Sequence, residues 1–234
     1  MEGPPVAVVT AAGKGLGAAI ARTMAAAGYS LALLSNQGGA ERIAGEVGGV
    51  AVTGSVTAAS DLQRLVDLAI DRYGRIDAVV NNTGHPPKGP LLELTDDDWH
   101  QGLDLVVLNV VKMARIVTPI LQGGGGGSIV NVSTYAAFEP EVAFPISASL
   151  RAGLAGFTKL YADTYAATGI RMNNVLPGFM DSYPESADLV ARIPMGRFAS
   201  VTEVAEVVRF LASDESSYIT GQNLKVDGGL AKSV

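Results

Sequence analysis

The chain contains no cysteine, so it can form no disulfide, no thiol nucleophile and no cysteine metal cluster. Its only two histidines, His85 and His100, do not stand in a metal-ligand spacing, so we expect no metal site. No apolar run approaches the roughly 18 residues of a membrane span, so we expect no membrane segment. The first residues carry no basic patch followed by an apolar stretch, so we expect no signal peptide and a cytoplasmic location.

Basic residues are too few and too scattered for a nucleic-acid surface. The 234 residues include 17 Lys and Arg against 23 Asp and Glu, a formal net charge of -6, which disfavours binding to phosphate backbones. Hydrophobic residues make up 48% of the chain, which is enough to bury one large core. We therefore expect a single domain over residues 1–234, with a small molecule rather than nucleic acid as its partner.

Short apolar runs alternate with helical stretches along the chain. The runs are nearly continuously apolar, which is typical of buried parallel strands. They lie at residues 6–10, 31–35, 50–54, 76–82, 128–133, 170–176 and 223–226. Helices are predicted at 16–27, 40–47, 61–73, 96–121, 147–168 and 201–211, with a capping box at 95–98 and a flexible glycine connector at 123–127. This order predicts βαβ crossovers and a doubly wound α/β sheet.

A glycine-rich turn follows the first predicted strand. The sequence TAAGKGLG at 10–17 opens the first helix, and Gly13, Gly15 and Gly17 permit positive φ angles and a close backbone approach. The helix directs its N-terminal amides at a phosphate group. Such glycines alone are a weak signal, but their place between the first strand and the first helix indicates a dinucleotide cradle.

Further motifs follow in a fixed order. They are NNTG at 81–84, Asn109 in the next helix, NVST at 131–134, PG at 177–178, YITGQ at 218–222 and VDGG at 226–229. With the glycine turn, this ordered set resembles the short-chain dehydrogenase/reductase family over essentially the whole chain. The resemblance implies a Rossmann-type three-layer sandwich with a seven-stranded parallel sheet, and a homotetramer or homodimer. Because apolar stripes on long helices are more often plain core, the oligomer rests on the resemblance alone.

The resemblance also implies a nicotinamide dinucleotide site. Its residues are Thr10, Gly13, Lys14, Gly15, Leu16, Gly17, Ser35, Asn36, Ser55, Val56, Asn82, Gly84, Arg151, Pro177, Gly178 and Ser182. Ala11 replaces the family's first glycine, which permits the turn if the φ of Ala11 is negative. The end of the second strand, SNQ at 35–37, has no acid to bind a ribose 2′-hydroxyl, and Lys14 adds a positive charge nearby. NADP(H) is therefore favoured over NAD(H); the alternative is a solvated Lys14 that contacts no phosphate.

The catalytic positions depart from the family pattern. The resemblance places Asn109, Thr134, Ser147 and Arg151 where the family has Asn, Ser, Tyr and Lys. An aliphatic hydroxyl is several pK units less acidic than a phenol of pKa about 10, so Ser147 is a poor general acid. Arg151 keeps a positive charge one helical turn away, but it does not release a proton as a lysine can.

Four further residues are expected in the substrate pocket: His85, Tyr135, Phe179 and Tyr183. The proton that the family's tyrosine would supply can come here from water, His85 or Tyr183. The alternatives are a solvated loop histidine at 85 and a tyrosine at 183 that packs only on its own segment.

Three functions remain open. The first is an NADP(H)-dependent oxidoreductase that transfers hydride to a small carbonyl, imine or activated alkene. The second is non-redox chemistry like that of halohydrin dehalogenases, which use Ser, Tyr and Arg; those enzymes lack the glycine cradle and keep the Tyr, the opposite of this chain. The third is a pseudoenzyme that binds NADP(H) as a structural or sensing ligand. The retained cradle, Asn109, Thr134 and the turn at 177–178 favour the first.

Overall fold

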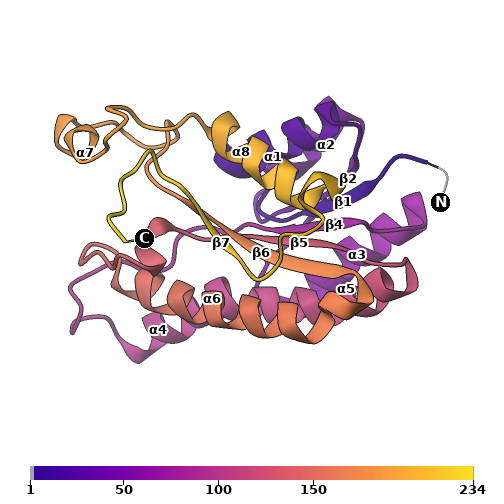
Figure 1. The fold of residues 1–234 in the computed structure, drawn as a ribbon. Helices are drawn as coiled ribbons and strands as arrows, with labels where there is room; N and C mark the ends of the chain where they lie inside the picture. Colours follow the sequence, from indigo (N-terminus) through magenta and orange to yellow (C-terminus); the bar gives the residue numbers. More distant parts are fainter. Residues whose placement is uncertain (1–2, 234) are drawn as a thin grey trace.

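The fold is organised around one seven-stranded parallel sheet. The structure is a computed structural model that describes residues 3–233. Its strand order is β3-β2-β1-β4-β5-β6-β7 (Figure 1). The strands are β1 (Val6–Val9), β2 (Ser30–Ser35), β3 (Val50–Thr53), β4 (Ala78–Asn81), β5 (Gly127–Val132), β6 (Ile170–Pro177) and β7 (Asn223–Val226). The predicted Rossmann-type α/β fold is therefore confirmed.

Helices cover both faces of this sheet and give the three layers seen in Figure 1. One face carries α1 (Gly15–Ala26), α2 (Gly39–Val47) and α8 (Val201–Ala212). The other carries α3 (Ala59–Tyr73), α4 (Asp96–Leu103), α5 (Asn109–Gly123) and α6 (Pro145–Tyr165). Within residues 3–233, no helix has the length and apolar character that crossing a bilayer requires.

The strand residues divide between two core layers. Ala7 and Val9 of β1 pack in the layer that contains α1 and α8, whereas Val8 packs in the layer that contains α3 and α5. All three side chains are fully buried. This two-sided burial explains why the strand runs are continuously apolar instead of alternating.

Two predicted helix features differ from the structure. The helix predicted over 96–121 is interrupted by a π-helical turn at Asp104–Leu108, so that α5 begins at Asn109. A π turn holds one extra residue per turn and leaves no mark in an apolar periodicity. The short helix α7 (Ala187–Ala191) was not predicted; none of its residues is buried, so it carries no apolar stripe. The capping box of Thr95 and Asp98 is confirmed.

The five-glycine segment is not merely a flexible connector. The Gly126 amide donates to the Leu121 carbonyl at 2.8 Å, and the Gly127 amide donates to the Gly169 carbonyl at 3.1 Å. A Cβ on Gly126 would lie 2.5 Å from the Gly169 oxygen. Glycine is needed here because two stretches of backbone approach each other closely.

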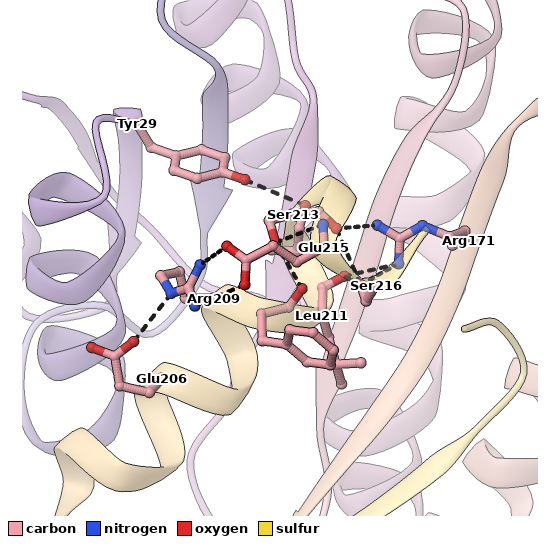
Figure 2. A network of polar contacts seen from close by, with 10 residues as sticks. Tyr29, Arg171, Glu206, Arg209, Leu211, Ser213, Glu215 and Ser216 are labelled. Atoms are coloured by element: carbon pink, nitrogen blue, oxygen red, sulfur yellow. Dashed lines mark hydrogen bonds and ion pairs between the residues drawn. The ribbon is translucent and has the colours of Figure 1, made fainter. Parts of the chain in front are cut away.

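A polar network fastens α8 to the sheet at the end of β6 remote from Pro177 (Figure 2). The guanidinium of Arg171 donates to the carbonyls of Leu211 and Ser213 at 3.0 and 2.8 Å, and to the Ser216 hydroxyl at 2.9 Å. Arg209 pairs with Glu215 nearby at 2.7 Å. Every labelled cation in this network therefore meets carbonyls or carboxylates.

Candidate active site

A cavity of about 1380 Å³ opens where β1, β2, β4, β5 and β6 end. In doubly wound sheets, ligands bind in the crevice at the carboxyl ends of the strands. Of the predicted site residues, all except Thr10 and Asn109 line this cavity. The sequence prediction did not include several other lining residues, among them Lys88, Gln101, Asp104 and Phe144.

The glycine turn at the start of α1 forms one wall of the cavity. A Cβ on Gly17 would lie 2.1 Å from the Ala11 carbonyl oxygen, so only glycine fits there. Gly15 has a φ of 51° and faces open space, where a Cβ would meet nothing nearer than Ser182 Cβ at 3.9 Å. Helix α1 has no side-chain cap and no acidic residue in its first turn, so its N-terminal amides are left for a ligand. The turn fits a phosphate group.

The backbone of Ala11 does not have the negative φ that the sequence analysis required of it. A negative φ would have made the replacement of glycine harmless, but Ala11 has a φ of 48°, the one positive φ of a non-glycine residue within 3–233. The left-handed region costs a residue with a Cβ roughly 1–2 kcal/mol. The turn is therefore kept at the expense of local backbone strain.

Thr10 reaches the site only through Asn82. Its hydroxyl donates to the Asn82 carbonyl at 2.7 Å and accepts from the Asn82 amide at 2.9 Å, which joins β1 to the loop after β4. Thr10 is itself almost fully buried. It positions the cavity wall and does not line it.

The end of β2 carries no acid, as the sequence predicted. The buried Ser35 hydroxyl accepts from the Ala40 amide at 2.8 Å and orders the start of α2, while Asn36 is exposed in the cavity. Arg42, which the sequence analysis did not single out, donates to the Gly13 carbonyl at 3.1 Å. With Lys14, this places two cations at the glycine turn.

Ser55 lines the cavity after β3. Its backbone amide donates to the Asp61 carboxylate at 2.8 Å.

Ser147 and Arg151 lie on one face of α6, as their spacing predicts. The Arg151 Nε donates to Ser147 Oγ at 3.3 Å, and its Nη1 donates to the Val132 carbonyl at 2.6 Å. Burial lowers the pKa of Arg151 to about 10. The guanidinium therefore stays charged at neutral pH. Thr134, on the loop after β5, lines the same cavity.

Three buried polar atoms at the site have no hydrogen-bond partner within residues 3–233. They are Thr83 Oγ1, Ser133 Oγ and Asn109 Oδ1. Thr83 and Ser133 line the cavity at the ends of β4 and β5, and Asn109 begins α5 directly after the π turn. Buried polar groups are normally paired, so these atoms mark places where a ligand or water completes the site.

His85 and Tyr183 meet across the cavity from segments 98 residues apart in the sequence. The Tyr183 hydroxyl contacts His85 Nε2, and the two rings pack edge to face with centroids 5.4 Å apart. Desolvation lowers the pKa of His85, and the positive charges of Lys88 and Arg151 lower it further. The imidazole is therefore neutral at pH 7.

Tyr135 is held on the side of the cavity nearer α7. Its hydroxyl donates to Glu141 at 2.9 Å, and Glu141 also pairs with Arg192, which follows α7. Desolvation and the neighbouring Glu141 raise the pKa of Tyr135 far above its usual value, so this phenol is a weak acid. The Tyr135 and Phe179 rings lie 5.8 Å apart. Tyr135 thus shapes the pocket but holds its proton firmly.

Comparison with known proteins agrees with this geometry. Residues 10–231 match a family model described as enoyl-(acyl carrier protein) reductase. The 3-oxoacyl-(acyl-carrier-protein) reductase of Thermotoga maritima is 38% identical over 75% of this chain and 74% of its own. The cis-4-hydroxycyclohexanecarboxylate dehydrogenase of Sinomonas cyclohexanicum is 35% identical over 96% of this chain and 95% of its own. The oxidoreductase UcpA of Escherichia coli is 34% identical over 95% and 93%.

The seven-stranded sheet, the glycine turn and the cavity at the strand ends define a nucleotide-binding α/β protein of the oxidoreductase type. The chain belongs to the short-chain dehydrogenase/reductase family.

Proposed function

We propose that the protein is an NADP(H)-dependent oxidoreductase that transfers hydride between the nicotinamide and a small carbonyl, imine or activated alkene. The observation that carries the proposal is the continuity of one cavity: it runs from the open N-terminus of α1 at Gly15 to Ser147 and Arg151. A nucleotide bound at the glycine turn would extend toward those side chains. Related proteins whose names describe reductases and dehydrogenases support the same class of reaction.

The cradle residues would hold the cofactor. Lys14 and the acid-free end of β2 suit a 2′-phosphate, because they offer positive charge and the strand end carries no carboxylate to repel it. Arg42, which donates to the Gly13 carbonyl, is also paired with Glu46. The amides that open α1 suit the pyrophosphate. The unpaired hydroxyls of Thr83 and Ser133, together with Pro177 and Gly178, lie on the side where the nicotinamide would bind. The cofactor supplies or accepts the hydride.

Ser147, Thr134 and Arg151 would bind the substrate oxygen. Because the Arg151 Nε already donates to Ser147 Oγ, the Ser147 hydrogen is free to point at a substrate. In the reductive direction a carbonyl carbon gains hydride, its oxygen gains a proton and becomes an alcohol, and the nicotinamide is oxidised. The buried charge of Arg151 would stabilise the negative charge that develops on this oxygen.

Ser147 is too weak an acid to deliver that proton at neutral pH. The contact between Tyr183 and His85 offers a phenol next to an imidazole in the same cavity. In our proposal Tyr183 gives its proton to the substrate oxygen and His85 replaces it from solvent. Water held by the Asn109 side-chain oxygen is the competing source.

A second candidate function is binding of NADP(H) without turnover. The replacement of the family's tyrosine and lysine by Ser147 and Arg151 favours it. A halohydrin dehalogenase-like lyase fits less well, because the glycine cradle is retained.

NADPH fluorescence titration of the purified protein, followed by a panel of ketones, imines and activated alkenes, tests these functions. Binding with turnover supports the oxidoreductase, and binding without turnover supports the non-catalytic protein. Release of halide from a halohydrin without cofactor supports the lyase. If the protein takes up neither NADPH nor NADH, the proposed function is wrong.

The proton donor is tested separately with Tyr183→Phe. We expect its kcat to fall about 10²-fold with a nearly unchanged KM, the lower end of the usual loss of a general acid. Tyr218→Phe is the matched control, because Tyr218 is fully exposed and lies outside the cavity. Equal kcat in Tyr183→Phe and wild type would exclude Tyr183 as the donor and leave His85 or water.

A further inference from the structure

Arg151 is a buried charge with no counter-charge. Its side chain is 6% exposed, yet its hydrogen bonds within residues 3–233 go only to the Val132 carbonyl and the Ser147 hydroxyl. Burial lowers the pKa of Arg151, and no carboxylate within those residues pairs with its guanidinium. Holding an ion in a protein interior costs several kcal/mol unless an opposite charge lies near. The cavity that Arg151 lines is the place where such a charge can enter.

Arg171 shows how the same chain treats another arginine withdrawn from solvent. Its guanidinium donates to three main-chain carbonyls and a hydroxyl; Figure 2 shows Arg171 beside Leu211, Ser213 and Ser216. Burial lowers the pKa of Arg171, and the negative charge of Asp214 opposes this shift. Arg171 lies far from the cavity and needs no ligand. In contrast to Arg171, Arg151 has only one carbonyl and one hydroxyl as partners within residues 3–233, and it lies at the cavity.

The charged residues around the cavity also favour an anionic ligand. Its charged lining residues are Lys14, Lys88, Asp104 and Arg151. The one acid, Asp104, is already paired with Lys112 at 3.0 Å. Although the net charge of the protein is -6, the described part of the chain lines this cavity with three cations, Lys14, Lys88 and Arg151, and with no carboxylate that pairs with them. Walls of one charge sign concentrate ligands of the other.

The cations divide between the two ends of the cavity. Lys14 is the N-cap residue of α1 at the glycine turn, where the phosphates of the proposed cofactor would meet its charge. Lys88 and Arg151 lie on the reaction side, since both act on His85. The Lys88 ammonium is exposed and sits 4.8 Å above the Phe144 ring, which itself lines the cavity. The reaction side therefore has a buried cation, Arg151, and an exposed cation beside an apolar ring, Lys88, and the charges of both reach His85.

We propose that the substrate is an anion: an oxo or hydroxy compound whose carboxylate pairs with Lys88 and supplies the counter-charge that Arg151 lacks. Its apolar part would pack against Phe144. This inference rests on the proposed function, because it concerns the substrate of the same site. The phosphates of the nucleotide would balance the charge of Lys14. The carboxylate of the substrate would balance the charges of Lys88 and Arg151.

Matched ligand pairs test the proposal. The probes are straight-chain oxo acids of four to eight carbons, such as 4-oxopentanoate, each compared with its methyl ester. Calorimetry measures the binding of both to the free protein and to the NADP⁺-saturated protein, and NADPH oxidation measures kcat/KM. We expect at least one acid to bind 10-fold or more tightly than its ester, and we expect its addition to raise the pKa of His85 in proton NMR spectra.

Two substitutions test the role of the Lys88 charge: Lys88→Gln removes it and Lys88→Glu reverses it. We expect Lys88→Gln to reduce the acid-to-ester ratio about 10-fold and Lys88→Glu to reduce it further. Lys159→Gln is the matched control, because Lys159 loses the same charge from an exposed face of α6 outside the cavity. Equal binding of acid and ester, an unchanged ratio in the Lys88 variants, or no binding of any acid would overturn the proposal.

The outcome is separable from that of the proposed function. If the protein takes up neither NADPH nor NADH, the oxidoreductase assignment fails, while the acid-to-ester ratio is still measured on the free protein. If the protein reduces acids and esters equally, the oxidoreductase stands and the anionic substrate is rejected.

Discussion

The two ends of the cavity are built in different ways. The end that we propose for the cofactor is made by backbone: a turn at 10–17 in which Gly17 leaves no room for a Cβ and the N-terminus of α1 has no side-chain cap. The reaction end is made by side chains from distant segments, including His85, Ser147 and Tyr183. In the proposed match to the family pattern, the first end differs at Ala11, and the second differs at three catalytic positions, Thr134, Ser147 and Arg151. Side chains on a stable scaffold can change without cost to the fold, whereas a backbone cradle cannot.

The largest effect is expected where the cradle is sterically closed. Gly17→Val would place a Cβ 2.1 Å from the Ala11 oxygen, against backbone that cannot yield. We expect the free energy of unfolding to fall by about 3 kcal/mol or more and NADPH binding to be lost. Urea unfolding and fluorescence titration measure the two effects.

Gly45→Ala is the control for this substitution, because a Cβ on Gly45 meets nothing within 4 Å. It lies in helix α2, so we expect a gain of about 0.5–1 kcal/mol. Equal stability of the two variants would show that the cradle is not sterically closed.

The reaction end should respond in the opposite way, by gaining activity. Ser147→Tyr combined with Arg151→Lys restores the phenol and the ammonium of the family pattern. We expect kcat for a neutral ketone to rise about 10²-fold, within the usual contribution of a general acid. Each single variant is the control, and neither should reach the rate of the pair. An unchanged rate in the double variant would place the limiting step outside proton transfer.

The stability of the reaction end should depend on pH through His85. Its pKa lies below 6.5 in the folded protein, so between 6.5 and that lower value the unfolded chain binds a proton that the folded protein does not. The stability that this group contributes is present above pH 6.5 and is lost as the pH falls. Unfolding measured at pH 8 and pH 5.5 should show this loss in wild type.

In His85→Gln, the free energy of unfolding should lose the pH dependence that comes from His85, while the pH dependence from the other titrating groups remains. With only two histidines in the chain, His100→Gln assigns the remaining imidazole signal for NMR titration. A pH dependence identical in wild type and His85→Gln would show that His85 is not desolvated in the cavity.

The smallest effect is expected at Ala11. Ala11→Gly relieves the strain of a φ of 48°, about 1–2 kcal/mol, but it adds conformational freedom to the unfolded chain worth about 0.5–1 kcal/mol. We expect a net gain below about 1 kcal/mol in urea unfolding, with unchanged NADPH affinity. A loss of stability would mean that Ala11 is unstrained at this φ.

Local patterns predicted most of the fold because they depend on neighbours in sequence. The apolar run that contains β1 and the glycines that open α1 identify their elements without any knowledge of the rest. Features without such a local mark were missed: the π turn at Asp104–Leu108 and the exposed helix α7. Lys88 was missed because nothing in its neighbourhood distinguishes it from a solvated lysine until the fold places it at the cavity.

By itself, the sequence determined the parallel sheet and the glycine turn, since spacing and residue type are local properties, and it supports the proposal that Ser147 and Arg151 stand where the family has Tyr and Lys. The tertiary structure alone decided that Ala11 adopts a left-handed backbone, that Tyr183 meets His85, and that no carboxylate among residues 3–233 pairs with Arg151. These features depend on which distant side chains share a space. Burial and charge are properties of that shared space, not of any one segment of the chain.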